Sequence, residues 1–162
     1  MAQQAVIQTM LDYHLGLGEK LWASVDQLSD AQFVQDIPYS VGSIRNQLVH
    51  LVTIETRWLR GLQGDANARA FQLEPAEYPD RKAVRELWEA HTQMVQEVVK
   101  KFDGDMLDQP AAGMNEPAWQ ILMHLVIHGV DHRAQILRGL HDLGVATFPQ
   151  DFIIYLWQKG NR

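Results

Sequence analysis

The chain has 162 residues, of which 46% are hydrophobic, and this is enough to build one domain with its own apolar core. The formal net charge is −6 and the basic residues are scattered apart from short runs such as Arg81-Lys82, so the chain lacks the basic surface typical of nucleic-acid binders. The absence of cysteine excludes disulfides and sulfur-ligated zinc, and it suits a cytoplasmic protein.

The first predicted helix covers residues 4–28 and carries one apolar stripe at helical spacing. The stripe consists of Val6, Met10, Tyr13, Leu17, Leu21, Val25 and Leu28. Gly16 and Gly18 interrupt this helix, and each costs roughly 1 kcal/mol relative to alanine. They therefore indicate either close contact with a neighbouring backbone, which we expect, or a weak helix centre. A break without helix is predicted from Ser29 to Pro38.

Ser43 is predicted to cap the second helix, which Gly61 and Gly64 end. Its stripe includes one charged residue and consists of Ile44, Leu48, Leu51, Glu55, Trp58 and Leu62. Residues 65–80 carry two prolines and no clear period, so they predict a long crossover instead of a tight turn. A crossover of this length permits the third helix to run parallel to the second.

The third predicted helix covers residues 81–102, and a loop follows over residues 103–116. Pro117 is placed in the first turn of the fourth helix, which Gly144 stops, and residues 151–157 form a short amphipathic tail. Four long amphipathic helices and no strand-like alternation predict an all-α protein, a single four-helix bundle domain over residues 1–162.

The first residues and the apolar stretches of the chain predict neither a targeting signal nor a membrane span. The N-terminal ten residues have no basic start and no small-residue cleavage site. The longest uncharged, mostly apolar stretch, Pro117 to Val130, is shorter than the roughly 20 residues that a membrane-spanning helix needs. We expect a cytoplasmic protein that contacts neither membrane nor nucleic acid.

Residues 124, 128 and 132 are histidines in one row of the fourth helix, because a step of four residues turns by only about 40°. The helix is apolar nearly all round between Trp119 and Val130, so these rings are expected in a dry site as neutral imidazoles, the form that binds metals. Neighbours in the row lie about 6 Å apart along the axis and can converge on one ion.

One such pair needs a further ligand from another helix, and His50 is the natural one on the shoulder of the second helix. The spacing alone does not separate a metal site from histidines that only pack in the core. Asp131 and Glu55 are the acid or base candidates, although each is more typical of a helix face or an ion pair. Arg133 is expected to pair with an acidic side chain. Three further histidines are expected to be isolated, partly exposed packing residues: His14, His91 and His141.

Two segments resemble the DinB-like (DinB/YfiT) metal-binding four-helix bundle family, and the resemblance extends over nearly the whole chain. The first is SIRNQLVH at residues 43–50, followed by Glu55, Trp58 and Leu59. The second is WQILMHLVIHGVDHRAQI at residues 119–136. The resemblance implies an up-down-down-up order of the helices with the long crossover between the second and the third.

The same resemblance implies that the metal ligands are His50, His128 and His132, and that His124 stays outside. The chain departs from the family at three places: Asp131 stands where a histidine is common, Ala134 where a glycine is common, and residues 16–18 replace a Trp-Ala-Asn run. The change at residues 16–18 makes any substrate pocket of relatives a poor guide to this chain.

Three imidazole ligands would leave an open position on a divalent ion, for which we expect zinc, with nickel as the alternative. An open zinc ion can activate water or bind a thiol. The family includes thiol S-transferases and isomerases that use low-molecular-weight thiols. We therefore expect a metal-dependent thiol S-transferase or hydrolase acting on a small molecule, and a non-catalytic metal-binding or stress-response protein is the alternative. The two-sided apolar face of the fourth helix predicts a homodimer.

Overall fold

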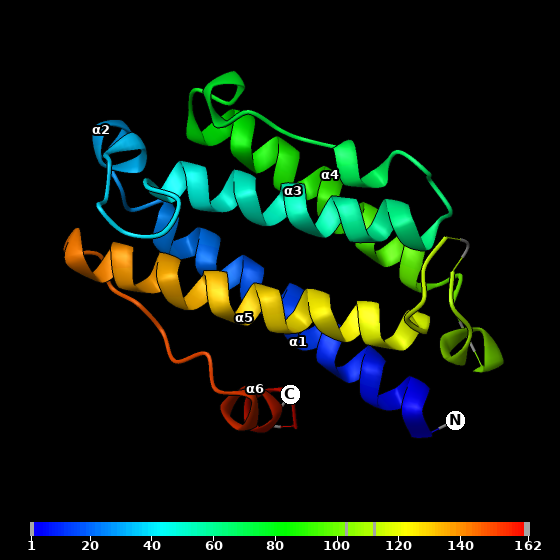
Figure 1. Cartoon of the computed structure of the whole chain (residues 1–162). Coiled ribbons are helices and arrows are strands. Elements are labelled where there is room, and N and C mark those ends of the chain that lie inside the picture. The colour runs from blue at the N-terminus through cyan, green and yellow to red at the C-terminus, as the bar shows by residue number, and fades with distance from the viewer. Residues whose placement is uncertain (1, 103, 112, 161–162) are drawn as a thin grey trace.

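The computed structural model describes residues 2–102, 104–111 and 113–160, and these residues are mainly helical (Figure 1). The four long helices are α1 (Ala2–Val25), α3 (Ile44–Leu62), α4 (Arg81–Val99) and α5 (Ala118–Asp142). The described residues form no β-strand, and their single isolated bridge joins Pro110 and Pro117. The predicted all-α class is confirmed. No helix in the described ranges is both long and apolar enough to cross a membrane.

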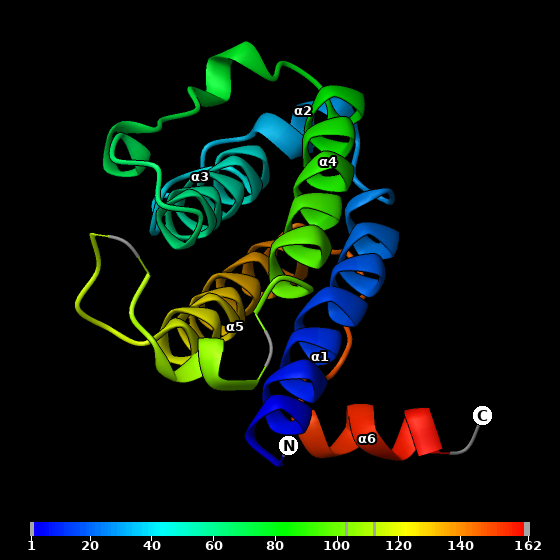
Figure 2. The same ribbon diagram turned by 90° about the vertical axis from the view of Figure 1, so that its right-hand side faces the viewer.

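The helix α5 packs against both α1 and α3, and α3 also packs against α4 (Figures 1 and 2). On the remaining side, Trp22 of α1 meets Trp88 of α4 edge to face, with ring centroids 6.2 Å apart. Gly18 makes room for this contact, because a Cβ there would lie only 3.0 Å from the Trp88 ring. The expected close approach to the first helix is therefore made by aromatic side chains and not by backbone.

The buried apolar residues form two clusters, and polar side chains are buried between them. On α3, Ile44, Leu48 and Val49 belong to one cluster, whereas Leu59 and Leu62 belong to the other. On α5, the two clusters take residues 118–126 and residues 136–140. The turns between these stretches contain His50, Glu55, His132 and Arg133. The two-part core thus places the candidate site near the middle of the long helices.

The start of α3 agrees with the sequence, whereas the region before it does not. The Ser43 hydroxyl caps α3 by accepting a hydrogen bond from the Asn46 backbone N–H. The predicted break after Ser29 contains a short helix, α2 (Asp30–Val34), because Ser29 and Gln32 form a capping box. Five residues are too few to show a helical period, so the pattern missed this helix.

The apolar stripe of α1 also needs one correction. Val6 is 59% exposed, and Ile7 and Leu11 are buried in its place. The later stripe positions Tyr13, Leu17 and Leu21 are buried as expected. Near its start, the buried face of α1 is therefore shifted by one residue from the predicted apolar stripe.

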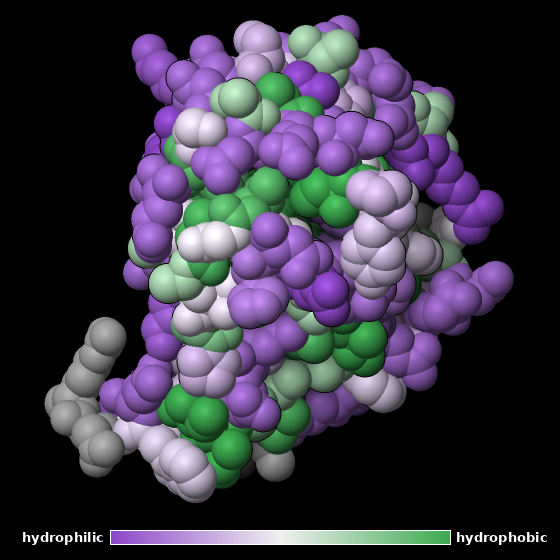
Figure 3. All heavy atoms as spheres, turned by 90° about the vertical axis from the view of Figure 1, so that its left-hand side faces the viewer, coloured by the Kyte–Doolittle hydropathy of each residue, from purple (hydrophilic) through white to green (hydrophobic). Residues whose placement is uncertain are grey.

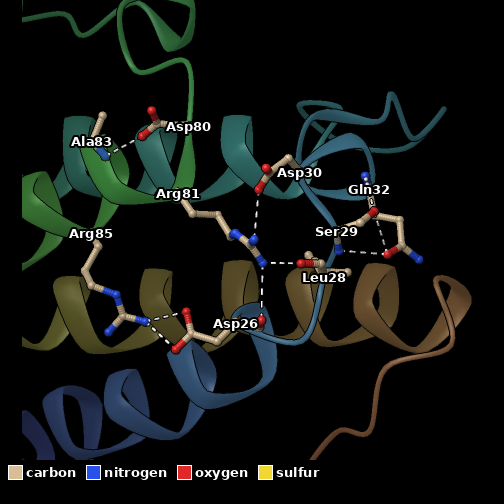
Figure 4. A network of polar contacts seen from close by, with 9 residues as sticks. All are labelled: Asp26, Leu28, Ser29, Asp30, Gln32, Asp80, Arg81, Ala83 and Arg85. Atoms are coloured by element: carbon tan, nitrogen blue, oxygen red, sulfur yellow. Dashed lines mark hydrogen bonds and ion pairs between the residues drawn. The ribbon is translucent and has the colours of Figure 1, made fainter.

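The crossover between α3 and α4 contains two short 3₁₀ helices, η1 (Ala68–Ala70) and η2 (Pro75–Glu77). Arg81 at the start of α4 then reaches the turn between α1 and α2, where it pairs with Asp30 at 2.8 Å and donates to the Leu28 carbonyl (Figure 4). Arg85 pairs with Asp26 at 2.6 Å in the same network. These contacts join the beginning of α4 to the end of α1.

The chain enters α5 directly after Pro117, following a third 3₁₀ helix, η3 (Gly104–Asp108), and it ends in α6 (Phe152–Gly160). The predicted amphipathic tail corresponds to α6, which crosses α1 with Phe152 and Tyr155 edge-on to Tyr13. Figure 3 shows the face at the left of Figure 1, where hydrophobic side chains occur in small groups between hydrophilic ones. That face offers no broad apolar area.

Candidate metal site

His50 of α3 and His128 and His132 of α5 come together between the two helices. One ring nitrogen from each of the three lies within 4.8 Å of the others. The ring centroid of His132 is 4.6 Å from that of His50 and 4.4 Å from that of His128. Nitrogens that share a tetrahedral zinc ion with bonds of about 2.0–2.1 Å are roughly 3.4 Å apart. Small rotations of the rings would therefore bring the cluster to the spacing of a metal site.

The three imidazoles are held in the neutral form that binds a metal. Burial, with help from the charges of His132, His50 and His124, lowers the pKa of His128 to about 4, against the opposing effect of Glu55. Burial also lowers the pKa of His50, and the charges of His132 and Arg57 lower it further. For His132, burial lowers the pKa against the opposing effect of Asp131 and Glu55. At neutral pH the cluster thus presents lone pairs instead of positive charges.

Neighbouring polar groups orient one of the rings. The Nδ1 atom of His132 lies 3.1 Å from the amide oxygen of Gln47, which can only accept, so Nδ1 carries the proton and Nε2 is left for an ion. The Gln47 amide nitrogen donates in turn to the Gln135 side chain at 3.2 Å. By contrast, Nδ1 of His128 is buried and has no hydrogen-bond partner among the described residues. A buried imidazole nitrogen without a partner fits a metal-binding role.

His124 lies beside the three-histidine cluster and not in it. Its ring centroid is 5.8 Å from that of His128 and 5.0 Å from that of Trp58, which it meets edge to face. His124 therefore continues the histidine row of α5 from His128 towards Trp58.

A second group of histidines lies in the core, where the sequence predicted partly exposed, isolated rings. His14 of α1 and His91 of α4 are each 4% exposed, so that prediction is wrong. Both rings contact the fully buried carboxylate of Glu55 on α3: His91 Nε2 lies 2.7 Å from Oε2, and His14 Nε2 lies 3.3 Å from Oε1. The Thr56 hydroxyl lies 3.3 Å from the other nitrogen of His91. His141 is exposed.

Glu55 is charged in this surrounding. Burial alone would raise the pKa of its carboxyl, but the hydrogen bonds and charges of His14 and His91 outweigh burial and hold the pKa well below its usual range. The position of Glu55 within an otherwise apolar stripe was the sequence signal that could have revealed this group. A buried carboxylate needs donors from other helices, and His14 and His91 supply them.

Two further predicted residues have clear positions. Asp131 is exposed on α5. Arg133 is buried, donates from Nε to the Gln150 side chain at 3.1 Å, and lies over the Tyr13 ring. Among the described residues, Arg133 forms no ion pair with an acidic side chain, so that expectation is wrong. Its guanidinium contacts an amide and an aromatic ring instead.

The sequence profile of the DinB family matches residues 1–162. The chain belongs to the DinB family. It is also similar to the protein called DinB from Bacillus subtilis (strain 168), with 25% identity over 160 residues, covering 91% of this chain and 92% of that protein. The family resemblance seen in residues 43–59 and 119–136 is thereby confirmed.

Proposed function

We propose that this DinB family protein binds a divalent metal ion through His50, His128 and His132 and acts on a small molecule as a metal-dependent thiol S-transferase or hydrolase. The observation that carries the proposal is the convergence of three neutral imidazoles from two helices, two of them half-buried. Three ligands leave at least one position for substrate or water. When bound there, a zinc ion would lower the pKa of a water molecule to about 7 or hold a thiol as thiolate.

The residues around the cluster would each contribute to such a site. Gln47 accepts a hydrogen bond from His132 Nδ1, which leaves Nε2 free for an ion. Glu55 provides a negative charge in the core, and this charge acts on both His128 and His132. Its own carboxylate is fully buried and occupied by two histidines, so Glu55 does not reach a substrate.

Several finer features belong to the same proposal. Zinc is the proposed ion because three neutral imidazoles suit it, and nickel is the alternative. The up-down-down-up order of the long helices is supported by the long crossover, and a cytoplasmic location by the lack of cysteine. A homodimer is supported by Ile127, which is 64% exposed on the outer face of α5. A low-molecular-weight thiol is the proposed co-substrate.

One observation favours the alternative, a non-catalytic metal-binding or stress-response protein. The two carboxylates considered as acid or base are unsuited to proton transfer at the cluster: Glu55 is sealed in the core, and Asp131 points to solvent. A site that only holds an ion needs neither residue.

The test is metal analysis of untagged protein, since affinity purification on nickel would load a three-histidine site artificially. We expect about one ion per chain after exposure to zinc, and none in a variant that combines His50→Ala with His128→Ala. His141→Ala, at an exposed histidine, is the matched control. Wild-type protein that stays metal-free would overturn the proposal. A protein that binds metal but shows neither thiol transfer nor hydrolysis would favour the non-catalytic alternative.

A further inference from the structure

A cavity of about 660 Å³ begins one helical turn from the three-histidine cluster, where Ile54 and His124 line it. Its walls are α3 from Ile54 to Gly61, residues 65–69 of the crossover, residues 113–116 before α5, and His124. Figure 2 shows the crossover and the loop before α5 on the same side of α3. Sites for small molecules commonly have volumes of about 300–1,000 Å³. The cavity is therefore of a size that encloses a small molecule.

The cavity and the histidine cluster follow one another along the same two helices. His50, Ile54 and Trp58 are four residues apart and form one row on α3, while His132, His128 and His124 form one row on α5. His50 meets His132 at one end, and Trp58 meets His124 at the other, with centroids 5.0 Å apart. A ligand bound in the cavity thus lies one helical turn from the cluster.

The part of the cavity nearest to the cluster is lined by apolar side chains of α3. Ile54 and Trp58 line it from α3, and Met114 of the loop lines the cavity farther along α3, at Gly61. Met114 sits directly on α3 at Gly61, where an added Cβ would lie 2.2 Å from its Cε atom. Because Gly61 has no side chain, Met114 can pack directly against α3 and form part of the cavity wall. An aromatic ring or a short hydrocarbon chain fits such a surface.

The polar lining of the cavity carries excess positive charge. Asp65 is neutralised by Arg60 at 3.3 Å. Arg57 donates to the neutral Phe71 carbonyl at 2.6 Å, so its positive charge is not cancelled. Arg69 and Glu116 also line the cavity, and neither has an ion-pair partner among the described residues. Two uncompensated cations and one anion favour a ligand with a negative group.

We propose that this cavity binds a small ligand with a flat aromatic or hydrocarbon body, which places its head group at the histidine cluster and an anionic group near Arg57 and Arg69. The assignment rests on the proposed metal function, because the head group must bind the ion. The cavity assignment goes beyond the metal function because it names the chemical class of the ligand and the surface that selects this ligand.

Three hydroxamates that share one metal-binding head can test each part separately. Acetohydroxamate has only the head, benzohydroxamate adds a ring, and 4-carboxybenzohydroxamate adds an anionic group. Their affinities for the zinc-loaded protein are measured by calorimetry, with metal-free protein as the blank. We expect the ring to tighten binding roughly tenfold by burial of apolar surface. The carboxylate is expected to add about threefold at low salt and nothing at high salt.

Variants then assign these gains to the cavity. Trp58→Ala is expected to remove the gain from the ring, whereas Trp157→Ala, at a 62% exposed tryptophan on α6, is the matched control. Arg69→Gln is expected to remove the gain from the carboxylate, whereas Arg138→Gln on the exposed face of α5 is its control. Arg69 is exposed, so its replacement keeps the test valid even if Trp58→Ala does not fold.

The outcomes separate the two proposals. Equal affinity for all three hydroxamates, or gains that survive Trp58→Ala and Arg69→Gln, would overturn the cavity assignment and leave the metal site standing. A protein that takes up no zinc, or whose zinc binds no hydroxamate, would overturn both. Gains that disappear only in the cavity variants would support the assignment.

Discussion

The protein holds two groups of histidines in the middle of its long helices, and their surroundings are opposite. His50, His128 and His132 lie between α3 and α5, mostly half-buried, with one ring nitrogen of each within 4.8 Å of the others. His14 and His91 are buried in the core, where both contact the Glu55 carboxylate. The first group is suited to bind an ion, and the second is already committed to an internal charge. The side chains that face each ring, and not the residue type, determine this difference.

Removal of the Glu55 carboxylate is expected to have the largest effect on stability. Glu55→Ala leaves His14 and His91 buried without their acceptor, so we expect the free energy of unfolding to fall by about 3–5 kcal/mol. Urea unfolding of metal-free protein measures this change. Glu89→Ala on the exposed side of α4 is the control and is expected to change stability by less than about 0.5 kcal/mol. An equally small effect for Glu55→Ala would mean that the contacts of Glu55 with His14 and His91 do not stabilise the fold.

Removal of a proposed ligand from the three-histidine cluster is expected to affect metal binding far more than folding. His132→Ala should weaken zinc binding at least about a hundredfold, because one of three ligands is lost. His124→Ala keeps all three and should retain the ion. Competition with a zinc chelator measures both affinities. The ligand assignment would be wrong if His124→Ala emptied the site while His132→Ala remained loaded.

Loss of the group that orients His132 is expected to have a smaller effect on the same equilibrium. Gln47→Leu removes the acceptor for the His132 Nδ1–H, so zinc affinity should fall roughly tenfold while the ion still binds. The same chelator competition measures this change, and an unfolding curve shows whether the variant stays folded. Unchanged affinity would show that helix packing alone orients the ring.

The two groups should also lose stability in different pH ranges. The folded-state pKa of His128 is lowered to about 4, so the unfolded chain binds its proton first, and stability falls as the pH drops from about 6.5 towards 4. The pKa of Glu55 is also lowered, but for a carboxyl the loss begins only below its unfolded pKa of about 4.3.

Thermal unfolding of metal-free protein at several pH values can separate these ranges. His128→Gln should flatten the change above pH 4, and Glu55→Gln should flatten the change below it. Identical pH profiles for wild type and both variants would contradict the opposite roles of the two groups.

Local spacing determined the long helices and the α5 pair of the three-histidine cluster. The i, i+4 repeat on α5 predicted that His128 and His132 share a face, and Ser43 predicted the start of α3, because both features depend only on residues within one helical turn. The short α2 escaped the same reasoning because it has too few residues for a period.

Tertiary packing decided which residues from other helices complete each group. His50 was proposed from the second helix, but only the packing of α3 on α5 brings its ring within 4.8 Å of the α5 pair. Nothing in the spacing of His14 and His91 indicated that they meet at Glu55, because they stand on α1 and α4, far apart in the chain. Gly129 lets His14 reach that point, since a Cβ there would lie 2.2 Å from its ring. Such contacts depend on how whole helices rotate and pack, and a one-dimensional pattern does not contain that rotation.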